Sequence, residues 1–239
     1  EKRKRNIYQQ SSFTITVPSL WLKSKVEQSL LSHKDIRLIY NGIDTDIFRP
    51  FPKKEMREKL GLPSDKKIIL SVIKRGQSNP WKGGNYVDKA IKAFAGLQNV
   101  IFICIGGEIN NPQVINIPFI EEEQTLALYY SASDILLHPA VAETFGLTIA
   151  EGMACGLPIV SFVTGSIPEL VENGWNGFLA EYKNSADLIS KLRLILNFRP
   201  EKLDEMGGHS QEKVKNNFTL KMMTDNYLRL YRWILDPIQ

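Results

Sequence analysis

The feature that most limits the folds open to this sequence is the regular alternation of short apolar runs with helical patterns. Apolar runs that suit buried strands lie at residues 67–73, 100–105 and 135–139, and the last of these ends at a proline. Between the first two, residues 87–94 place apolar side chains on one helical face. Strands that alternate with helices in this way predict an α/β fold, with a doubly wound parallel sheet that carries helices on both faces.

A pair of carboxylates, Glu143 and Glu151, follows the third of these apolar runs. Because Gly156 ends the next helical pattern, we expect a helix to begin near Gly146, with Glu151 a little over one turn inside it. The free N–H groups of residues 146–148 would then form an anion site. Carboxylates repel a bare phosphate but bind hydroxyl groups, so a sugar and a ribose that flank a diphosphate would fit. For either glutamate alone, a structural role near the helix N-terminus is the alternative.

A group of cations follows the first apolar run. The loop at residues 74–84 contains Lys74, Arg75 and Lys82 together with glycines, and it lies at the carboxyl end of the predicted strand. Ligands of open α/β sheets bind at that end, where these cations would neutralise a diphosphate. Lys82 is the main candidate, and either Lys74 or Arg75 would act beside it. Both of the latter also suit an exposed loop without a ligand.

These motifs resemble, over most of the chain, the retaining glycosyltransferases of the GT-B fold, family 4 type. Glu143-Thr144-Phe145-Gly146-Leu147, followed by Glu151, matches their E-x7-E motif. Further matches are Lys82-Gly83, Gly156-Leu157-Pro158, Gly165-Ser166-Ile167-Pro168-Glu169 and Asn176-Gly177. The sequence departs from the usual pattern at Thr144, Gly152 and Ser166.

The resemblance implies a Rossmann-like domain, the C-terminal half of a GT-B enzyme, that binds a nucleoside diphosphate sugar. Glu143 and Lys82 would be catalytic, and a hexose-type sugar would pass to a glycan, lipid or small-molecule acceptor without a metal or cofactor. Glu151 would bind the ribose. A non-catalytic nucleotide-binding module on the same fold is the alternative. The implied nucleotide-sugar contacts are Lys74, Arg75, Lys82, Ile120, Glu143, Phe145, Gly146, Leu147 and Glu151.

The resemblance also divides the chain. Residues 41–50 resemble the crossing between the two halves of such enzymes, so residues 1–45 are expected to be a remnant of the N-terminal acceptor domain and residues 46–239 the donor domain. Since residue 1 is Glu, we expect the chain to be a piece of a longer protein. The missing N-terminal domain would be its partner, and this piece alone would be inactive in sugar transfer.

Composition supports an ordinary globular protein, with 43% hydrophobic and 23% charged residues. Two cysteines, Cys104 and Cys155, lie in a strand and at a helix end, which suggests packed thiols in the cytoplasm. The net charge of +4 is concentrated in the first 60 residues. A solvated face explains this basic segment, with peripheral contact to the inner membrane surface as the alternative; nucleic acid is not expected as a partner. Asp44-Thr45-Asp46 reads as a turn and not a metal site.

Overall fold

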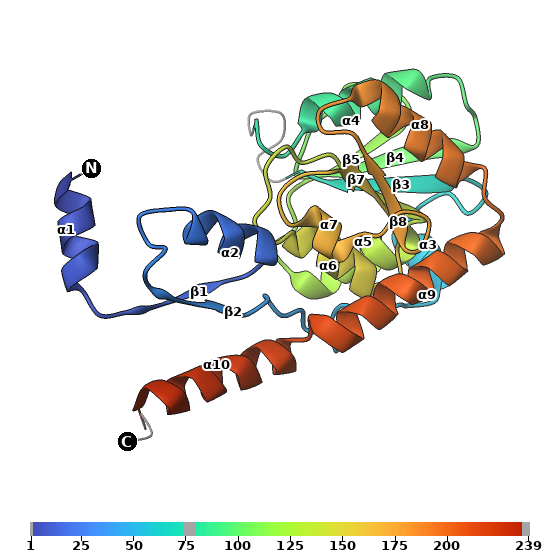
Figure 1. The fold of residues 1–239 in the computed structure, drawn as a ribbon. Helices are drawn as coiled ribbons and strands as arrows, with labels where there is room; N and C mark the ends of the chain where they lie inside the picture. The colour runs from blue at the N-terminus through green and yellow to red at the C-terminus, as the bar shows by residue number, and fades with distance from the viewer. Residues whose placement is uncertain (1, 74–79, 236–239) are drawn as a thin grey trace.

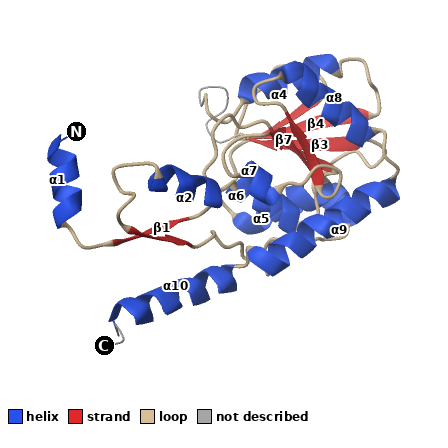
Figure 2. Ribbon diagram, in the orientation of Figure 1, coloured by secondary structure: helices blue, strands red, loops and turns tan. Residues whose placement is uncertain are grey.

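The large sheet of this protein is built from parallel strands, as the sequence predicts (Figures 1 and 2). The computed structural model describes residues 2–73 and 80–235. Within this part of the chain, six strands lie in the order β5-β4-β3-β6-β7-β8, and each pairs in parallel with its neighbours. The strands are β3 (Lys67–Val72), β4 (Val100–Ile105), β5 (Val114–Ile117), β6 (Ile135–His138), β7 (Ile159–Phe162) and β8 (Gly177–Ala180).

Helices cover both faces of this sheet, so the predicted doubly wound arrangement is confirmed (Figure 1). Consecutive residues of β3 show the reason, because Ile69 packs into one apolar cluster and Ile68 and Leu70 pack into the other. The first cluster includes α4 (Gly84–Ala93) and α8 (Ser185–Leu196). The second includes α3 (Lys53–Lys59), α5 (Glu123–Ala132) and α6 (Leu147–Ala154), and α9 (Pro200–Asn217) packs against α6.

The strand order reverses between β3 and β6. From β3 the chain moves outward to β4 and β5, and it then returns to the other side of β3 to form β6, β7 and β8. The carboxyl ends of β3 and β6 therefore lie side by side, at the point where the strands that follow continue toward opposite edges of the sheet. This switch point is the usual ligand site of an open α/β sheet.

A separate two-stranded parallel sheet stands beside the large one (Figure 2). It consists of β1 (Thr14–Val17) and β2 (Asp35–Leu38), joined by α2 (Leu20–Glu27), whose N-cap is Ser19. The last helix, α10 (Leu220–Leu235), runs back along this part (Figure 1). Tyr227 Oη on α10 donates to Thr16 Oγ1 at 3.3 Å, and Arg37 lies over the Trp233 ring. The N-terminal and C-terminal segments of the chain therefore meet outside the large sheet.

Three local features of the structure go beyond what the sequence suggests. Residues 2–10, whose first four are basic, form α1 (Lys2–Gln10), which the sequence analysis did not predict. β5 ends at Ile117, because Pro118 has no N–H to extend the ladder. The apolar side chains of α10 are only partly covered, since Leu230 is buried while Tyr231 and Ile234 are about half exposed. Among the described residues, no helix combines the length and apolar character needed to cross a bilayer.

A buried ion network joins α3 to the amino ends of β3 and β6. The Asp134 carboxylate accepts from Arg57 Nη2 and from the backbone N–H of Ile68, both at 2.7 Å, and it contacts Lys53 Nζ at 2.9 Å. Burial opposes ionisation of Asp134, but Lys53, the Ile68 N–H and Arg57 outweigh it and lower its pKa. The network therefore keeps a charged carboxylate inside the protein and aligns the two central strands.

Replacement of Asp134 should destabilise the fold. Asp134→Ala leaves Arg57 buried without its anion, and we expect a loss of about 3–5 kcal/mol in the free energy of unfolding, measured by urea denaturation. The control is Asp225→Ala, which removes an exposed ion pair with Lys221 on α10 and should leave stability unchanged. Equal stability of the two variants would contradict this account of the network.

Candidate functional site

A pocket of about 310 Å³ lies at the switch point, where the carboxyl end of β3 faces the loop that follows β6. It brings together every described residue that the sequence analysis named for the site. Lys74 and Arg75 lie outside the described residues. Its walls are formed by Asn41, Val72, Lys82, Phe119, Ile120, Leu126, Glu143, Thr144, Phe145, Gly146, Leu147, Thr148 and Glu151.

One wall of the pocket is the N-terminus of α6. Gly146 is its N-cap and adopts φ 94°, a left-handed conformation that favours glycine. The carbonyl of Gly146 accepts the first helical hydrogen bond, from Ala150 N, so the helix begins where the sequence predicted. Residues 146–148 all line the pocket, and the side chain of Phe145 is buried against the core. The positive end of the helix dipole therefore faces the pocket.

Lys82 is placed by a close backbone approach. Gly83 has φ 71°, and a Cβ atom there would lie 1.8 Å from the carbonyl oxygen of Pro139, so a larger residue cannot occupy this position. Beside it, Val141 N donates to the Trp81 carbonyl at 2.9 Å. The loop is thus pressed against the end of β6, and Lys82 Nζ reaches Glu143 Oε2 at 2.9 Å.

Glu143 lies between Lys82 and His138. Besides Lys82, its Oε2 is 3.4 Å from Nε2 of His138, which is 3% exposed at the end of β6. Burial opposes ionisation of Glu143, but the contacts with His138 and Lys82 outweigh it and lower the pKa to about 2. A lone histidine at a strand end carries no clear signal in the sequence, but the structure places His138 directly beside the carboxylate.

The backbone of Glu143 is held as tightly as its side chain. Gly165 has φ 52°, and a Cβ atom there would lie 1.9 Å from the Glu143 carbonyl oxygen. The next residue, Ser166, donates its N–H to the same oxygen at 3.3 Å. Residues 165–166 lead into the short helix α7 (Ile167–Leu170), so α7 and the loop of Glu143 form one packed unit.

Glu151 is oriented by a buried tyrosine that the sequence analysis did not identify. Tyr130 Oη on α5 donates to Glu151 Oε2 at 2.9 Å, and the Tyr130 side chain is fully buried. Burial raises the pKa of Glu151, partly offset by the hydrogen bond from Tyr130. From sequence, Tyr130 is one of several core residues of a helix, and only its hydroxyl group distinguishes it.

The described residues contain no cluster of three or more His, Cys, Asp or Glu side chains that could hold a metal ion. The carboxylate of Asp44 accepts from the backbone N–H groups of Asp46 at 2.9 Å and Ile47 at 3.4 Å. Asp44 therefore closes a turn at the crossing segment, as its sequence context suggests.

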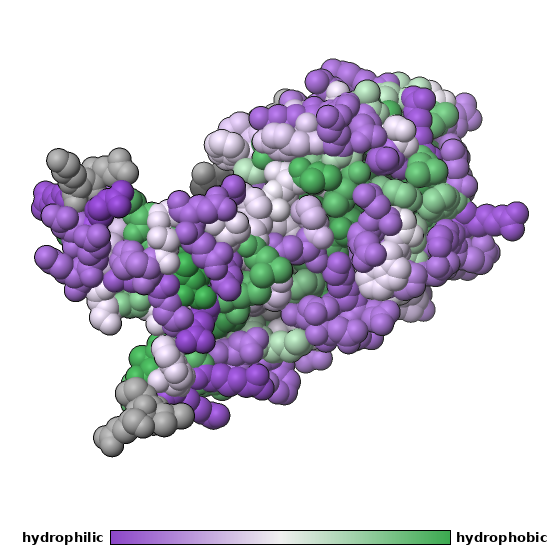
Figure 3. All heavy atoms as spheres, viewed as in Figure 1, coloured by the Kyte–Doolittle hydropathy of each residue, from purple (hydrophilic) through white to green (hydrophobic). Residues whose placement is uncertain are grey.

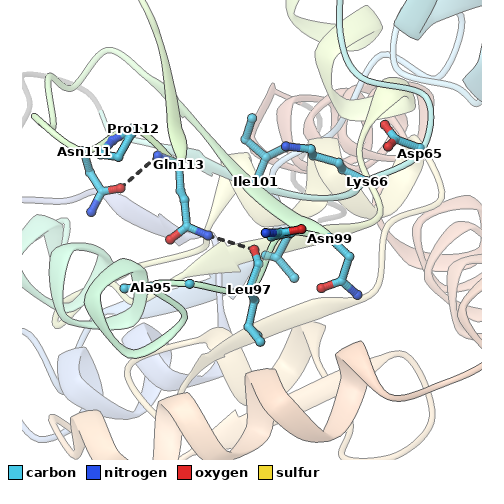
Figure 4. Close-up of a pocket in the computed structure, with 12 residues that line it drawn as sticks. Asp65, Lys66, Ala95, Leu97, Asn99, Ile101, Asn111, Pro112 and Gln113 are labelled. Carbon is cyan, nitrogen blue, oxygen red and sulfur yellow. Dashed lines mark hydrogen bonds between the residues drawn. The ribbon is translucent and has the colours of Figure 1, made fainter.

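A larger hollow, about 760 Å³, lies at the amino ends of β3 and β4 (Figure 4). Its wall includes Gln113, whose Nε2 donates to the Leu97 carbonyl at 2.9 Å, and Lys66 and Asn99 face it from the strand ends. It lies at the amino ends of the strands, whereas the pocket with the two glutamates lies at their carboxyl ends. We place the functional site at the smaller pocket because helix dipole, cation and carboxylates converge there and the strand order reverses there.

Comparison with known proteins gives one family. The family model described as "Glycosyl transferases group 1" matches residues 52–213. Among curated proteins, N-acetyl-alpha-D-glucosaminyl L-malate synthase of Bacillus anthracis is 24% identical over 240 residues, which cover 95% of this chain and 61% of that protein. D-inositol 3-phosphate glycosyltransferase of Mycolicibacterium smegmatis is 26% identical over 211 residues, 81% of this chain and 47% of that protein. The chain thus spans about half the length of these relatives.

Solved structures show the same fold. Sucrose-phosphate synthase from Thermosynechococcus elongatus superposes with a TM-score of 0.87 at 22% identity, over 98% of this chain and 61% of that one. Anabaena Alr3699/HepE in complex with UDP-glucose superposes with a TM-score of 0.78 at 19% identity, over 96% of this chain and 66% of that one. The superpositions include the small two-stranded sheet, since they cover nearly the whole chain.

The depressed pKa of Glu143 predicts a pH-dependent contribution to stability. A folded pKa of about 2 against 4.5 for the ordinary carboxyl means that ionised Glu143 stabilises the fold above pH 4.5, and that this stabilisation is lost as pH falls toward 2. In urea denaturation, Glu143→Gln should therefore be less stable than the wild type by up to about 3 kcal/mol at pH 7, and by much less at pH 3. The same replacement of the exposed Glu58 on α3 serves as the control. A Glu143→Gln deficit that stays constant between these pH values would rule out the ion-pair explanation.

Proposed function

Since this chain belongs to the group 1 glycosyl transferases and has the fold of the C-terminal half of a GT-B enzyme, we propose that it is the donor-binding domain of a retaining transferase. Its donor would be a nucleoside diphosphate sugar with a hexose-type sugar. The observation that carries this proposal is the convergence of Lys82, Glu143 and Glu151 on one pocket at the N-terminus of α6.

The diphosphate is proposed to lie between the N-terminus of α6 and Lys82. Backbone N–H groups and the helix dipole favour an anion there, and the side chain of Lys82 is 29% exposed, which leaves room for a phosphate beside Glu143. As the nucleoside diphosphate leaves, negative charge develops on its phosphate oxygens, and a lysine already fixed in place stabilises that charge. This supports a transfer step that needs no metal ion and no cofactor.

Glu143 is proposed to hold the hydroxyl groups of the donor sugar. Its low pKa keeps it ionised at neutral pH, so it can accept hydrogen bonds and stabilise an oxocarbenium-like transition state. A covalent bond to the sugar is not required of it. The acceptor would attack on the face from which the diphosphate departs, which gives retention of configuration.

Glu151 is proposed to bind the ribose. Tyr130 fixes one oxygen of the carboxylate, and the other can accept from a ribose hydroxyl in the pocket. Ile120, Phe119 and Leu126 offer an apolar wall for the base. A uracil nucleotide is the first to test, because the similar structure of Anabaena Alr3699/HepE is a complex with UDP-glucose.

The acceptor is proposed to bind mainly outside this chain. Residues 1–45, with the two-stranded sheet, would be the remnant of an N-terminal acceptor domain, and residues 46–239 the donor domain. Apolar side chains are exposed over α2 and β1, among them Phe13, Leu20 and Trp21, and the missing domain would cover them (Figure 3). The proposed acceptor is a glycan or a lipid. The proposed enzyme is cytoplasmic and contacts the membrane peripherally. Without proximity to an acceptor, this chain should bind donor but form no glycosylated product in a transfer assay.

Removal of Glu151 should weaken nucleotide binding. By calorimetry on this chain, Glu151→Ala should lose roughly 1.5–3 kcal/mol of binding free energy for the nucleoside diphosphate, the usual size for hydrogen bonds to a charged group. Glu123→Ala, at an exposed position on α5 that raises the pKa of Glu151, is the control and should bind at least as well as the wild type. Equal affinity of Glu151→Ala and wild type would show that Glu151 does not bind the ribose. A non-catalytic binding module would pass this test yet show no turnover as the full-length protein.

Removal of Lys82 should act on the reaction rate. In the full-length enzyme, Lys82→Ala should lower kcat by about 10²-fold, the scale of losing one preorganised charge partner. Lys89→Ala, on the exposed side of α4, should leave kcat unchanged. Chelators should also leave the wild-type rate unchanged, and strict dependence on a divalent metal would contradict the proposed role of Lys82.

A further inference from the structure

Glu169 on α7 forms a connection that the proposed chemistry does not use. Its Oε2 accepts from the backbone N–H of Leu20 and its Oε1 from that of Trp21, both at 2.9 Å. Tyr40 Oη donates to Oε2 at 3.1 Å. One carboxylate of the large domain therefore accepts hydrogen bonds from the start of α2 and from Tyr40, which follows β2.

The two amides belong to the first turn of α2, where a helix leaves N–H groups without internal partners. The helix's own cap, Ser19, accepts only from Leu22 N, at 3.1 Å. Glu169 accepts from the two amides that precede Leu22, those of Leu20 and Trp21. A negative charge at this point also interacts favourably with the helix dipole. Glu169 thus completes the N-terminal cap of α2 from a position 149 residues away in the sequence.

Tyr40, which follows β2, is the third donor to the Glu169 carboxylate. Burial and the charge of Glu169 raise the pKa of Tyr40 to about 12, so its hydroxyl remains a donor at neutral pH. Its ring packs against Phe218 and Phe145, with centroid distances of 5.1 and 6.3 Å. The next residue, Asn41, lines the pocket. Tyr40 therefore joins Glu169 to the entrance of the candidate site.

Through α7, Glu169 is also connected to the catalytic loop. Gly165 and Ser166, directly before α7, pack on the Glu143 carbonyl, as described above. A shift of α7 would therefore displace Glu143, and a shift of α2 would be transmitted to α7 through Glu169. The position of the N-terminal segment and the position of Glu143 depend on the same short helix.

We propose that Glu169 is a positioning residue that clamps residues 14–40 to the wall of the donor pocket. The clamp sets where the acceptor side of the protein stands relative to Glu143. This role rests on the proposed transferase function for its effect on catalysis, but the clamp itself is a property of the fold. Glu169 touches neither the proposed diphosphate nor the ribose position, so it should affect transfer and not nucleotide affinity.

Hydrogen exchange on the 239-residue chain tests the clamp without any assumption about function. Glu169→Gln keeps the shape of the side chain but offers only one oxygen for two amides. Exchange at Leu20 and Trp21 should accelerate at least tenfold, while exchange in β3 and β6 stays as in the wild type. The control is Glu172→Gln, the same substitution at an exposed position just after α7.

A second variant tests the contact from the other side. Leu20→Pro removes the Leu20 donor at the first position of α2, where proline is well tolerated, and the extended conformation of Ser19 suits a residue before proline. Exchange at Trp21 should accelerate in this variant too. Unchanged exchange at Trp21 in both Glu169→Gln and Leu20→Pro would overturn the clamp.

Kinetics of the full-length enzyme test its consequence. Glu169→Gln should lower kcat or raise the acceptor KM at least tenfold, with the Kd for the nucleoside diphosphate unchanged, and Tyr40→Phe should act in the same direction more weakly. Loss of nucleotide binding in Glu169→Gln would instead place Glu169 in the donor pocket and overturn the inference. If the wild type neither binds nucleotide nor transfers sugar, the proposed function fails, whereas the clamp still stands or falls on the exchange result.

Discussion

The site depends on the burial of one negative charge, the carboxylate of Glu143. A buried carboxylate at the end of a parallel sheet is costly unless charged or polar groups contact it. Here Lys82 Nζ lies 2.9 Å from Glu143 Oε2, and His138 Nε2 lies 3.4 Å from it. Both side chains come from backbone that is fixed in place: Lys82 beside Gly83, which packs against Pro139, and His138 at the end of β6. The Lys82–Glu143 ion pair thus joins the residues just before α4 to the loop that follows β6.

The alternation of apolar runs and helical patterns was enough to predict the sheet and its parallel pairing. The motif around Glu143 and Glu151 predicted which residues meet in the pocket at the N-terminus of α6, because the glycine N-cap at Gly146 sets where the helix begins and how Glu151 is directed. Interactions between distant segments could not be predicted in this way. The hydroxyl of Tyr130, the ring of His138 and the carboxylate of Glu169 have no periodic or spacing signal that distinguishes them from core or surface residues. Likewise, α1 has four cations in its first turn and no apolar period that would announce a helix.

The two sheets of the protein differ in how they are packed. The six-stranded sheet has its own core on both faces and its own pocket, whereas the two-stranded sheet has few neighbours besides α2 and α10. Glu169 and Tyr40 connect the small sheet to the pocket wall, and α10 runs back to it from the end of the chain. In an enzyme that must bring two substrates together, such a connection has to orient the two parts of the protein and still let a ligand enter between them.

The most direct test of the account is a crystal structure of this chain with the nucleoside diphosphate that raises its melting temperature most. The account predicts the diphosphate at the N-terminus of α6 within hydrogen-bonding distance of Lys82, and the ribose hydroxyls on Glu151. A nucleotide bound elsewhere, for example in the hollow at the amino ends of β3 and β4, with the pocket beside Glu143 left empty, would contradict it.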